Sequence, residues 1–133
     1  MKENKNKQSL PDTILVVENE VLVRTSIAQY LRHCGYTVIE ASSAEEGIIV
    51  LTTIDAPIHI VFSSVELSGA MDGFGLAQWV RANKPGIEVV LAGTIVKAAH
   101  VAGDLCEKGP HLGKPYEPQQ VVEWIKRLRN SPK

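Results

Sequence analysis

Several short apolar runs of this chain are followed by polar clusters whose side chains have the types needed for metal binding or nucleophilic chemistry. Glu18-Asn19-Glu20 follows one run, Ser64-Val65-Glu66 follows another, and Lys114-Pro115 stands near the end. Carboxylate and amide oxygens are the hard ligands that magnesium prefers. A serine activated by a lysine can act as a nucleophile. If the fold brings these clusters together, they form one site.

The elements that must position the clusters alternate between strand and helix patterns. Short apolar or β-branched runs predict five strands, at 14–17, 37–39, 58–62, 87–91 and 111–112. Apolar residues at helical spacing predict five helices, at about 23–34, 44–51, 74–84, 94–101 and 121–128. Gly35 is expected to end the first helix and Gly103 the fourth. Phe74 is expected on the apolar face of the third helix with Leu76, Ala77 and Val80. The alternation predicts an α/β fold, a doubly wound parallel sheet of five strands, with the clusters at its carboxyl edge.

Length, charge and cysteine usage limit the classes of protein. A chain of 133 residues is expected to form one domain, 12–130, with polar tails at 1–11 and 131–133. Its net charge of -1 predicts no nucleic-acid partner. No apolar run approaches the ~20 residues of a membrane span, so a cytoplasmic location is expected. Cys34 and Cys106 lack metal or redox spacing and are predicted to be reduced thiols.

Three motifs resemble the CheY-like receiver domain of response regulators in two-component signalling. They occur in the family's order and spacing within about Thr13 to Leu128, and they are Val16-Val17-Glu18-Asn19-Glu20, Met71-Asp72-Gly73-Phe74 and Lys114-Pro115-Tyr116. The resemblance implies a flavodoxin-like sheet with strand order 2-1-3-4-5. It also implies an acidic pair after the first strand that helps to hold magnesium, and an aspartate ending the third strand that accepts a phosphoryl group. A Ser or Thr hydroxyl after the fourth strand and a lysine before a cis proline are implied to contact that group. Lys114-Pro115 is therefore expected to be cis.

The chain departs from this pattern where the chemistry is done. The acceptor, the second acidic position and the hydroxyl position are occupied by Ser64, Asn19 and Ala92. A serine hydroxyl does not replace a carboxylate nucleophile without a general base. Glu18, with Asn19 and Glu66, is expected to bind magnesium weakly or not at all. The chain is thus predicted to be a stand-alone degenerate receiver that acts by protein–protein contact, with no cofactor and no enzymatic activity.

Alternatives remain open for several of these residues. Ser64 is an inert filler, a phosphorylatable hydroxyl, or the nucleophile of a Ser-Lys hydrolase with Lys114. Asp72 is a turn residue or a replacement acceptor. Glu18 and Asn19 cap a helix or bind metal. Lys114 pairs with Glu18 or binds an anion.

The expected partner is a sensor kinase or another signalling protein, with a homodimer as an alternative. By resemblance, the contact face combines the fourth helix, fifth strand and fifth helix. Its candidate anchors are Ile95, Val96, His111 and Trp124. Simple packing for Trp124 and an edge-strand surface position for His111 are the alternatives. The four histidines show no metal-ligand spacing, so no zinc site is expected.

Overall fold

The computed structural model describes residues 12–53, 55, 57–109 and 114–130 as a parallel sheet covered by five helices. The strands are β2 (Thr13–Val17), β3 (Thr37–Ala41), β4 (Ile60–Ser64) and β5 (Glu88–Ala92). The helices are α1 (Val21–His33), α2 (Ala44–Thr53), α3 (Gly73–Asn83), α4 (Ile95–Lys108) and α5 (Pro118–Arg129). The described sheet has four strands in the order β3-β2-β4-β5, not the expected five. The expected fifth strand, at 111–112, lies outside the described residues.

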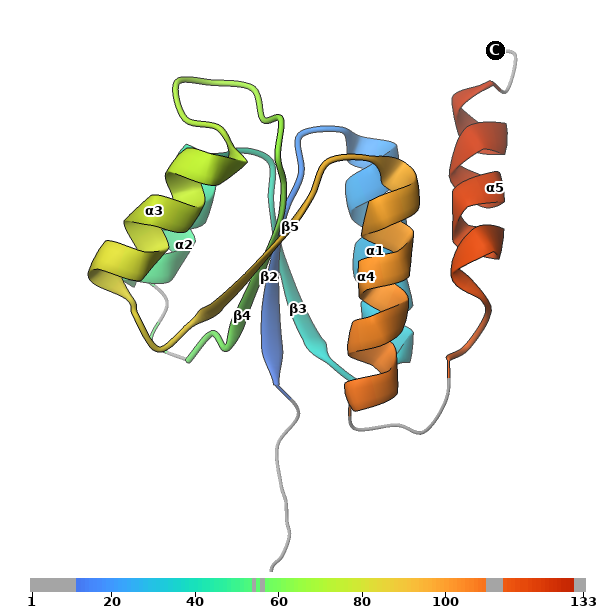
Figure 1. Cartoon of the computed structure of the whole chain (residues 1–133), viewed down its shortest axis with the longest axis horizontal. Helices are drawn as coiled ribbons and strands as arrows, with labels where there is room; N and C mark the ends of the chain where they lie inside the picture. Colours follow the sequence, from blue (N-terminus) through green and yellow to red (C-terminus); the bar gives the residue numbers. More distant parts are fainter. Residues whose placement is uncertain (1–11, 54, 56, 110–113, 131–133) are drawn as a thin grey trace, which may run out of the picture.

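The helices cover the two faces of the sheet unequally (Figure 1). Helices α1, α4 and α5 lie on one face, and α2 and α3 lie on the other. Successive side chains of a strand point to opposite faces. Ile14 and Val16 of β2 therefore pack under α1 and α4, whereas Leu15 and Val17 pack under α2 and α3. Both faces of β2 are buried, which explains its unbroken apolar run.

Helix α5 runs antiparallel to α1 and α4 (Figure 1). Its last residue, Arg129, contacts Glu20 just before α1 begins. Tyr116, just before α5, accepts a hydrogen bond from Tyr30, in the third turn of α1. In the described residues, α4 and α5 thus form an antiparallel helix pair, and no strand is described between them.

The prediction that α4 ends near residue 101 is wrong, because α4 continues through Gly103 to Lys108. A Cβ atom on Gly103 would lie 2.7 Å from Cγ of Pro118. The missing side chain is what lets the start of α5 approach α4 closely. Gly103 therefore serves packing between two helices rather than helix termination.

The prediction of reduced thiols is also wrong. Cys34 and Cys106 form a disulfide with a Cα–Cα distance of 5.2 Å, and both residues are fully buried. Helical spacing puts one cysteine on the core side of the end of α1 and the other on the core side of α4. The two are 72 residues apart in sequence, so no short motif announces the pair.

Two local predictions about helix ends have different outcomes. Gly35 follows α1 with φ of 100°, the left-handed conformation that glycine adopts readily at helix ends. Phe74, expected on the apolar face of α3, is 57% exposed. At 100° per residue it lies roughly 115° from the mean direction of Leu76, Ala77 and Val80, which are buried.

Candidate functional site

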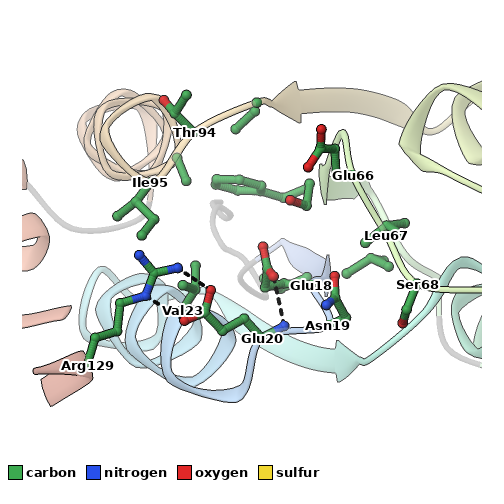
Figure 2. Close-up of a pocket in the computed structure, with 17 residues that line it drawn as sticks. Glu18, Asn19, Glu20, Val23, Glu66, Leu67, Ser68, Thr94, Ile95 and Arg129 are labelled. Atoms are coloured by element: carbon green, nitrogen blue, oxygen red, sulfur yellow. Dashed lines mark hydrogen bonds and ion pairs between the residues drawn. The ribbon is translucent and has the colours of Figure 1, made fainter. Parts of the chain in front are cut away.

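A pocket of about 450 Å³ opens where β2, β4 and β5 end and α1 and α4 begin (Figure 2). Its polar lining residues are Glu18, Asn19, Glu20, Ser64, Glu66, Ser68, Thr94 and Arg129. Val16, Phe62 and Ile95 are among its apolar lining residues. This is the carboxyl edge of the sheet, where parallel α/β folds place their chemistry.

Ser64 is the last residue of β4. It is half-buried and lines the pocket. It lies opposite Ala92 of β5 in the parallel ladder, and the Val65 N–H donates to the Ala92 carbonyl at 3.1 Å. Gly73 approaches closely: its N–H donates to the Val65 carbonyl at 2.8 Å, and a Cβ there would lie 2.1 Å from the Ser64 carbonyl oxygen. The Ser64 backbone is therefore fixed from two sides. Asp72 accepts from the Gly75 N–H at 2.8 Å and caps α3.

Glu18 is held in place by hydrogen bonds rather than standing free in the pocket. Its N–H donates to the Ala41 carbonyl at 3.0 Å, and its Oε2 accepts from the Glu20 N–H at 2.8 Å. Arg24 donates to the Glu18 carbonyl at 2.9 Å. The N-cap of α1 is Glu20 itself, so Glu18 supports the helix start from two residues before it and Asn19 is not the cap.

Arg129 supplies a cation to this pocket that the sequence analysis missed. Its Nε donates to Glu20 Oε2 at 2.6 Å, and its Nη2 contacts Glu20 Oε1 (Figure 2). The hydrogen bond from Arg129 holds the pKa of the Glu20 carboxyl below its usual range. The two residues are 109 positions apart, and only the direction of α5 brings them together. No motif in the sequence could have indicated the pair.

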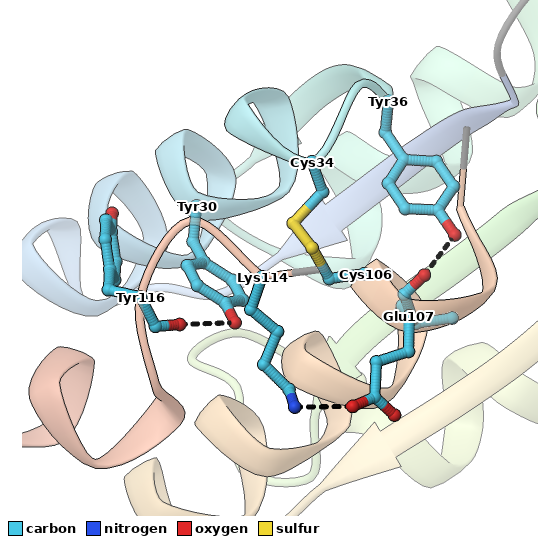
Figure 3. Close-up of a disulfide and its surroundings, with 8 residues drawn as sticks. Tyr30, Cys34, Tyr36, Cys106, Glu107, Lys114 and Tyr116 are labelled. Atoms are coloured by element: carbon cyan, nitrogen blue, oxygen red, sulfur yellow. Dashed lines mark hydrogen bonds and ion pairs between the residues drawn. A yellow bond between two sulfur atoms is a disulfide. The ribbon is translucent and has the colours of Figure 1, made fainter. Parts of the chain in front are cut away.

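Lys114 does not pair with Glu18, contrary to one prediction. Its Nζ donates to Glu107 Oε2 at 2.5 Å, near the last turn of α4, and Lys114 does not line the described part of the pocket (Figure 3). Since α4 starts at the pocket, Glu107 lies roughly 18 Å along it, at 1.5 Å per residue. The hydrogen bond to Glu107 raises the pKa of Lys114. The described peptide bonds contain no cis bond, so the predicted cis Lys114-Pro115 is wrong too.

Two of the candidate contact residues, Ile95 and Trp124, border different cavities. Ile95 lines the pocket, and Val96 is 45% exposed on α4. Trp124, 37% exposed, borders a separate groove of about 440 Å³ formed by Tyr116, Gln119, Gln120, Glu123 and Arg127. His111 lies outside the described residues.

Comparison with known proteins identifies the family. Residues 14–126 match the response regulator receiver domain model, and the chain belongs to that family of two-component signalling domains. It is 29% identical over 117 residues to the sensor kinase CckA of Brucella abortus, and 25% identical over 118 residues to the transcriptional regulatory protein AruR of Pseudomonas aeruginosa. These matches cover 87% and 86% of this chain, but only 12% and 48% of those proteins.

Solved structures support the fold. A CheY-like receiver domain from Methanospirillum hungatei superposes with a TM-score of 0.57 at 22% identity, covering 88% of this chain and 92% of that one. A receiver domain from Clostridium thermocellum gives 0.59 at 22% identity, covering 89% and 97%. Within the described ranges, no helix is long and apolar enough to cross a membrane.

The receiver family implies a magnesium ion at this pocket, and the described side chains fit one poorly. Among the residues that the structure places, no three His, Cys, Asp or Glu side chains are grouped to hold a metal ion. One oxygen of Glu18 already accepts a backbone hydrogen bond, and Glu20 is paired with a guanidinium. Magnesium needs carboxylate oxygens that can turn toward it and usually keeps several waters.

Proposed function

We propose that the chain is a degenerate receiver domain, which acts by protein–protein contact and is not phosphorylated on an aspartate. The observation that carries this proposal is the serine at the end of β4, inside the pocket. An acyl phosphate forms when a carboxylate oxygen attacks phosphorus. The Ser64 hydroxyl keeps its proton near neutral pH. Its oxygen can attack phosphorus only if a general base removes that proton.

The position of Lys114 supports the same conclusion. A phosphoryl group gained in the pocket would need a nearby cation to neutralise its charge, and Lys114 is instead bonded to Glu107 at the other end of α4. The same separation disfavours a Ser-Lys hydrolase, in which the two side chains must be within hydrogen-bond reach. Thr94 does not replace the lost hydroxyl freely, because its Oγ1 accepts from the Lys97 N–H at 3.0 Å as the cap of α4.

The partner is proposed to be a sensor kinase or another signalling protein, contacted through the outer face of α5. Half-exposed Trp124 beside a groove fits the aromatic anchors that dominate many interfaces. A homodimer through this face is the alternative, and sedimentation over a range of protein concentrations distinguishes the two. If the homodimer forms, Trp124→Ala should weaken it, whereas Phe74→Ala, on the opposite face, should not.

Incubation with acetyl phosphate and magnesium, followed by intact mass, tests the proposal. The wild-type chain should gain no phosphoryl group. Ser64→Asp should gain one slowly: its carboxylate oxygen bonds to phosphorus as the bond to the leaving acetate breaks, and hydroxylamine should remove the product. Ser68→Asp is the matched control, since Ser68 lines the same pocket but not a strand end, and it should stay unmodified.

Addition of Asn19→Asp to Ser64→Asp should speed the gain of mass, because a second carboxylate strengthens cation binding. Ala92 is 3% exposed within the core, so a bulkier residue there would mix packing effects with chemistry. A wild-type chain that takes up phosphate as fast as the double variant would overturn the proposal. Mapping of the modified residue would then separate Ser64 from Asp72.

A further inference from the structure

Arg129 is the one feature of the pocket that neither the strand ends nor the family pattern supplies. It reaches the pocket from the last turn of α5, where its positive charge also suits the partial negative charge at the carboxyl end of that helix. Two of its nitrogen atoms face the two carboxylate oxygens of Glu20 (Figure 2). This two-point geometry is the strongest that a guanidinium makes with a carboxylate.

The remaining lining residues make the pocket acidic around Arg129. Glu18, Glu20 and Glu66 provide three carboxylates, and Arg129 is the single cationic side chain among the described residues that line it. The hydrogen bond to Glu20, followed by the negative charges of Glu20 and Glu18, raises the pKa of Arg129. Arg129 therefore lies within the electrostatic field of Glu18 as well as Glu20.

A divalent cation and the Arg129 guanidinium would compete for the same negative charge. Both carboxylate oxygens of Glu20 are engaged while it holds the two nitrogen atoms of Arg129, and two positive charges roughly 8 Å apart repel each other. We propose that Arg129 is the resident cation of this pocket and weakens the binding of divalent metal ions there. The proposal rests on the proposed function, because it takes the pocket to be that of a degenerate receiver. In such a pocket the cation is a side chain of the protein itself.

The Arg129–Glu20 pair can be weakened, because it lies at the surface. The side chains of Arg129 and Glu20 are 41% and 36% exposed, and exposed pairs are weakened by salt. Removal of Arg129 should therefore open the pocket to metal without unfolding the domain. The conservative replacement Arg129→Lys keeps the positive charge and should therefore bind a divalent ion as weakly as the wild type.

Titration of the full chain with Mn²⁺ at low ionic strength tests the proposal. The readouts are calorimetry and loss of the electron paramagnetic resonance signal of free Mn²⁺. Arg129→Gln should bind Mn²⁺ about fivefold more tightly than the wild type, from removal of one unit charge at roughly 8 Å in water. Lys108→Gln removes an equal charge at the far end of α4 and should match the wild type. Arg129→Lys should also match it.

Glu20→Gln distinguishes the effect of the Arg129 charge from the effect of its contact with Glu20. It releases Arg129 but also removes one carboxylate, so its Mn²⁺ affinity should stay below that of Arg129→Gln. Equal affinities of the wild type and Arg129→Gln, or no Mn²⁺ binding by either, would overturn the proposal. These outcomes are independent of the phosphodonor assay: a phosphorylated wild type defeats the proposed function, and only the Mn²⁺ ratio defeats the role of Arg129.

Discussion

The layer formed by α1, α4 and α5 is held differently at its two ends. Away from the pocket, the Cys34–Cys106 disulfide joins α1 to α4, and the Tyr36 hydroxyl donates to the Leu105 carbonyl (Figure 3). At the pocket, the surface pair of Arg129 and Glu20 joins α5 to the start of α1. One end is covalent and buried, whereas the other is ionic and exposed.

The two ends of this helical layer therefore differ in how much they stabilise the fold and in how easily their contacts can change. Buried cross-links contribute several kcal/mol, whereas exposed ion pairs contribute about 0–1 kcal/mol. The end far from the pocket therefore fixes α4 relative to α1, and the pocket end can change its contacts at small cost. Low-stability regions of this kind are where ligand-dependent changes are usually found.

The largest expected effect comes from the disulfide. Replacement of both cysteines by alanine, Cys34→Ala with Cys106→Ala, should lower the free energy of unfolding by about 2–4 kcal/mol, since the link closes a long loop in the unfolded chain. Urea unfolding measures the loss. A reducing agent should destabilise the wild type and leave the double variant unchanged. Detection of two titratable thiols in the native protein would show that the end of the layer far from the pocket is not covalently linked.

A smaller effect is expected from Tyr30, whose hydroxyl donates to the Tyr116 carbonyl at 3.0 Å. Burial, followed by the charge of Glu117, raises the pKa of Tyr30 from 10.0 to about 12. Because the folded pKa is the higher one, the stabilisation is complete below pH 10 and is lost as the pH rises toward about 12. Unfolding measured across this range should show a loss on the order of 2 kcal/mol.

Tyr30→Phe provides the control for this alkaline loss. It should cost about 1 kcal/mol at neutral pH through the lost hydrogen bond and should flatten the curve above pH 10. An unchanged alkaline slope in Tyr30→Phe would show that other groups, such as the buried Tyr36 and the partly buried Tyr116, cause the loss.

The smallest expected effect is at the pocket end. Glu20→Gln and Arg129→Gln should each change the free energy of unfolding by less than about 1 kcal/mol. The hydrogen bond from Arg129 lowers the pKa of Glu20 in the folded state. Its contribution to the free energy of unfolding is therefore present when the pH is above the usual pKa of a glutamate, and it disappears as the pH falls through the lowered pKa. A double-mutant cycle at low and high salt measures it. A coupling as large as the effect of the disulfide would contradict the comparison.

The sequence predicted the parts of the fold that depend on local pattern. Unbroken apolar runs such as 14–17 predicted strands buried on both faces, and Gly35 predicted the end of α1. The arrangement of α4 and α5 was not predictable in the same way, because Gly103 breaks helices in isolation but permits close packing here. The positions of Lys114 and Arg129 follow from that arrangement. Ser64 and Glu18 were expected at the pocket because they directly follow or end strands.

The close approach of Gly73 to Ser64 has a mechanical consequence. The first residue of α3 abuts the last peptide of β4, with its N–H bonded to the Val65 carbonyl and no room for even one methyl group. A displacement of the Ser64 peptide must therefore push α3 or break that hydrogen bond. A movement of the backbone at the pocket is therefore transmitted through Gly73 to α3, on the other face of the sheet.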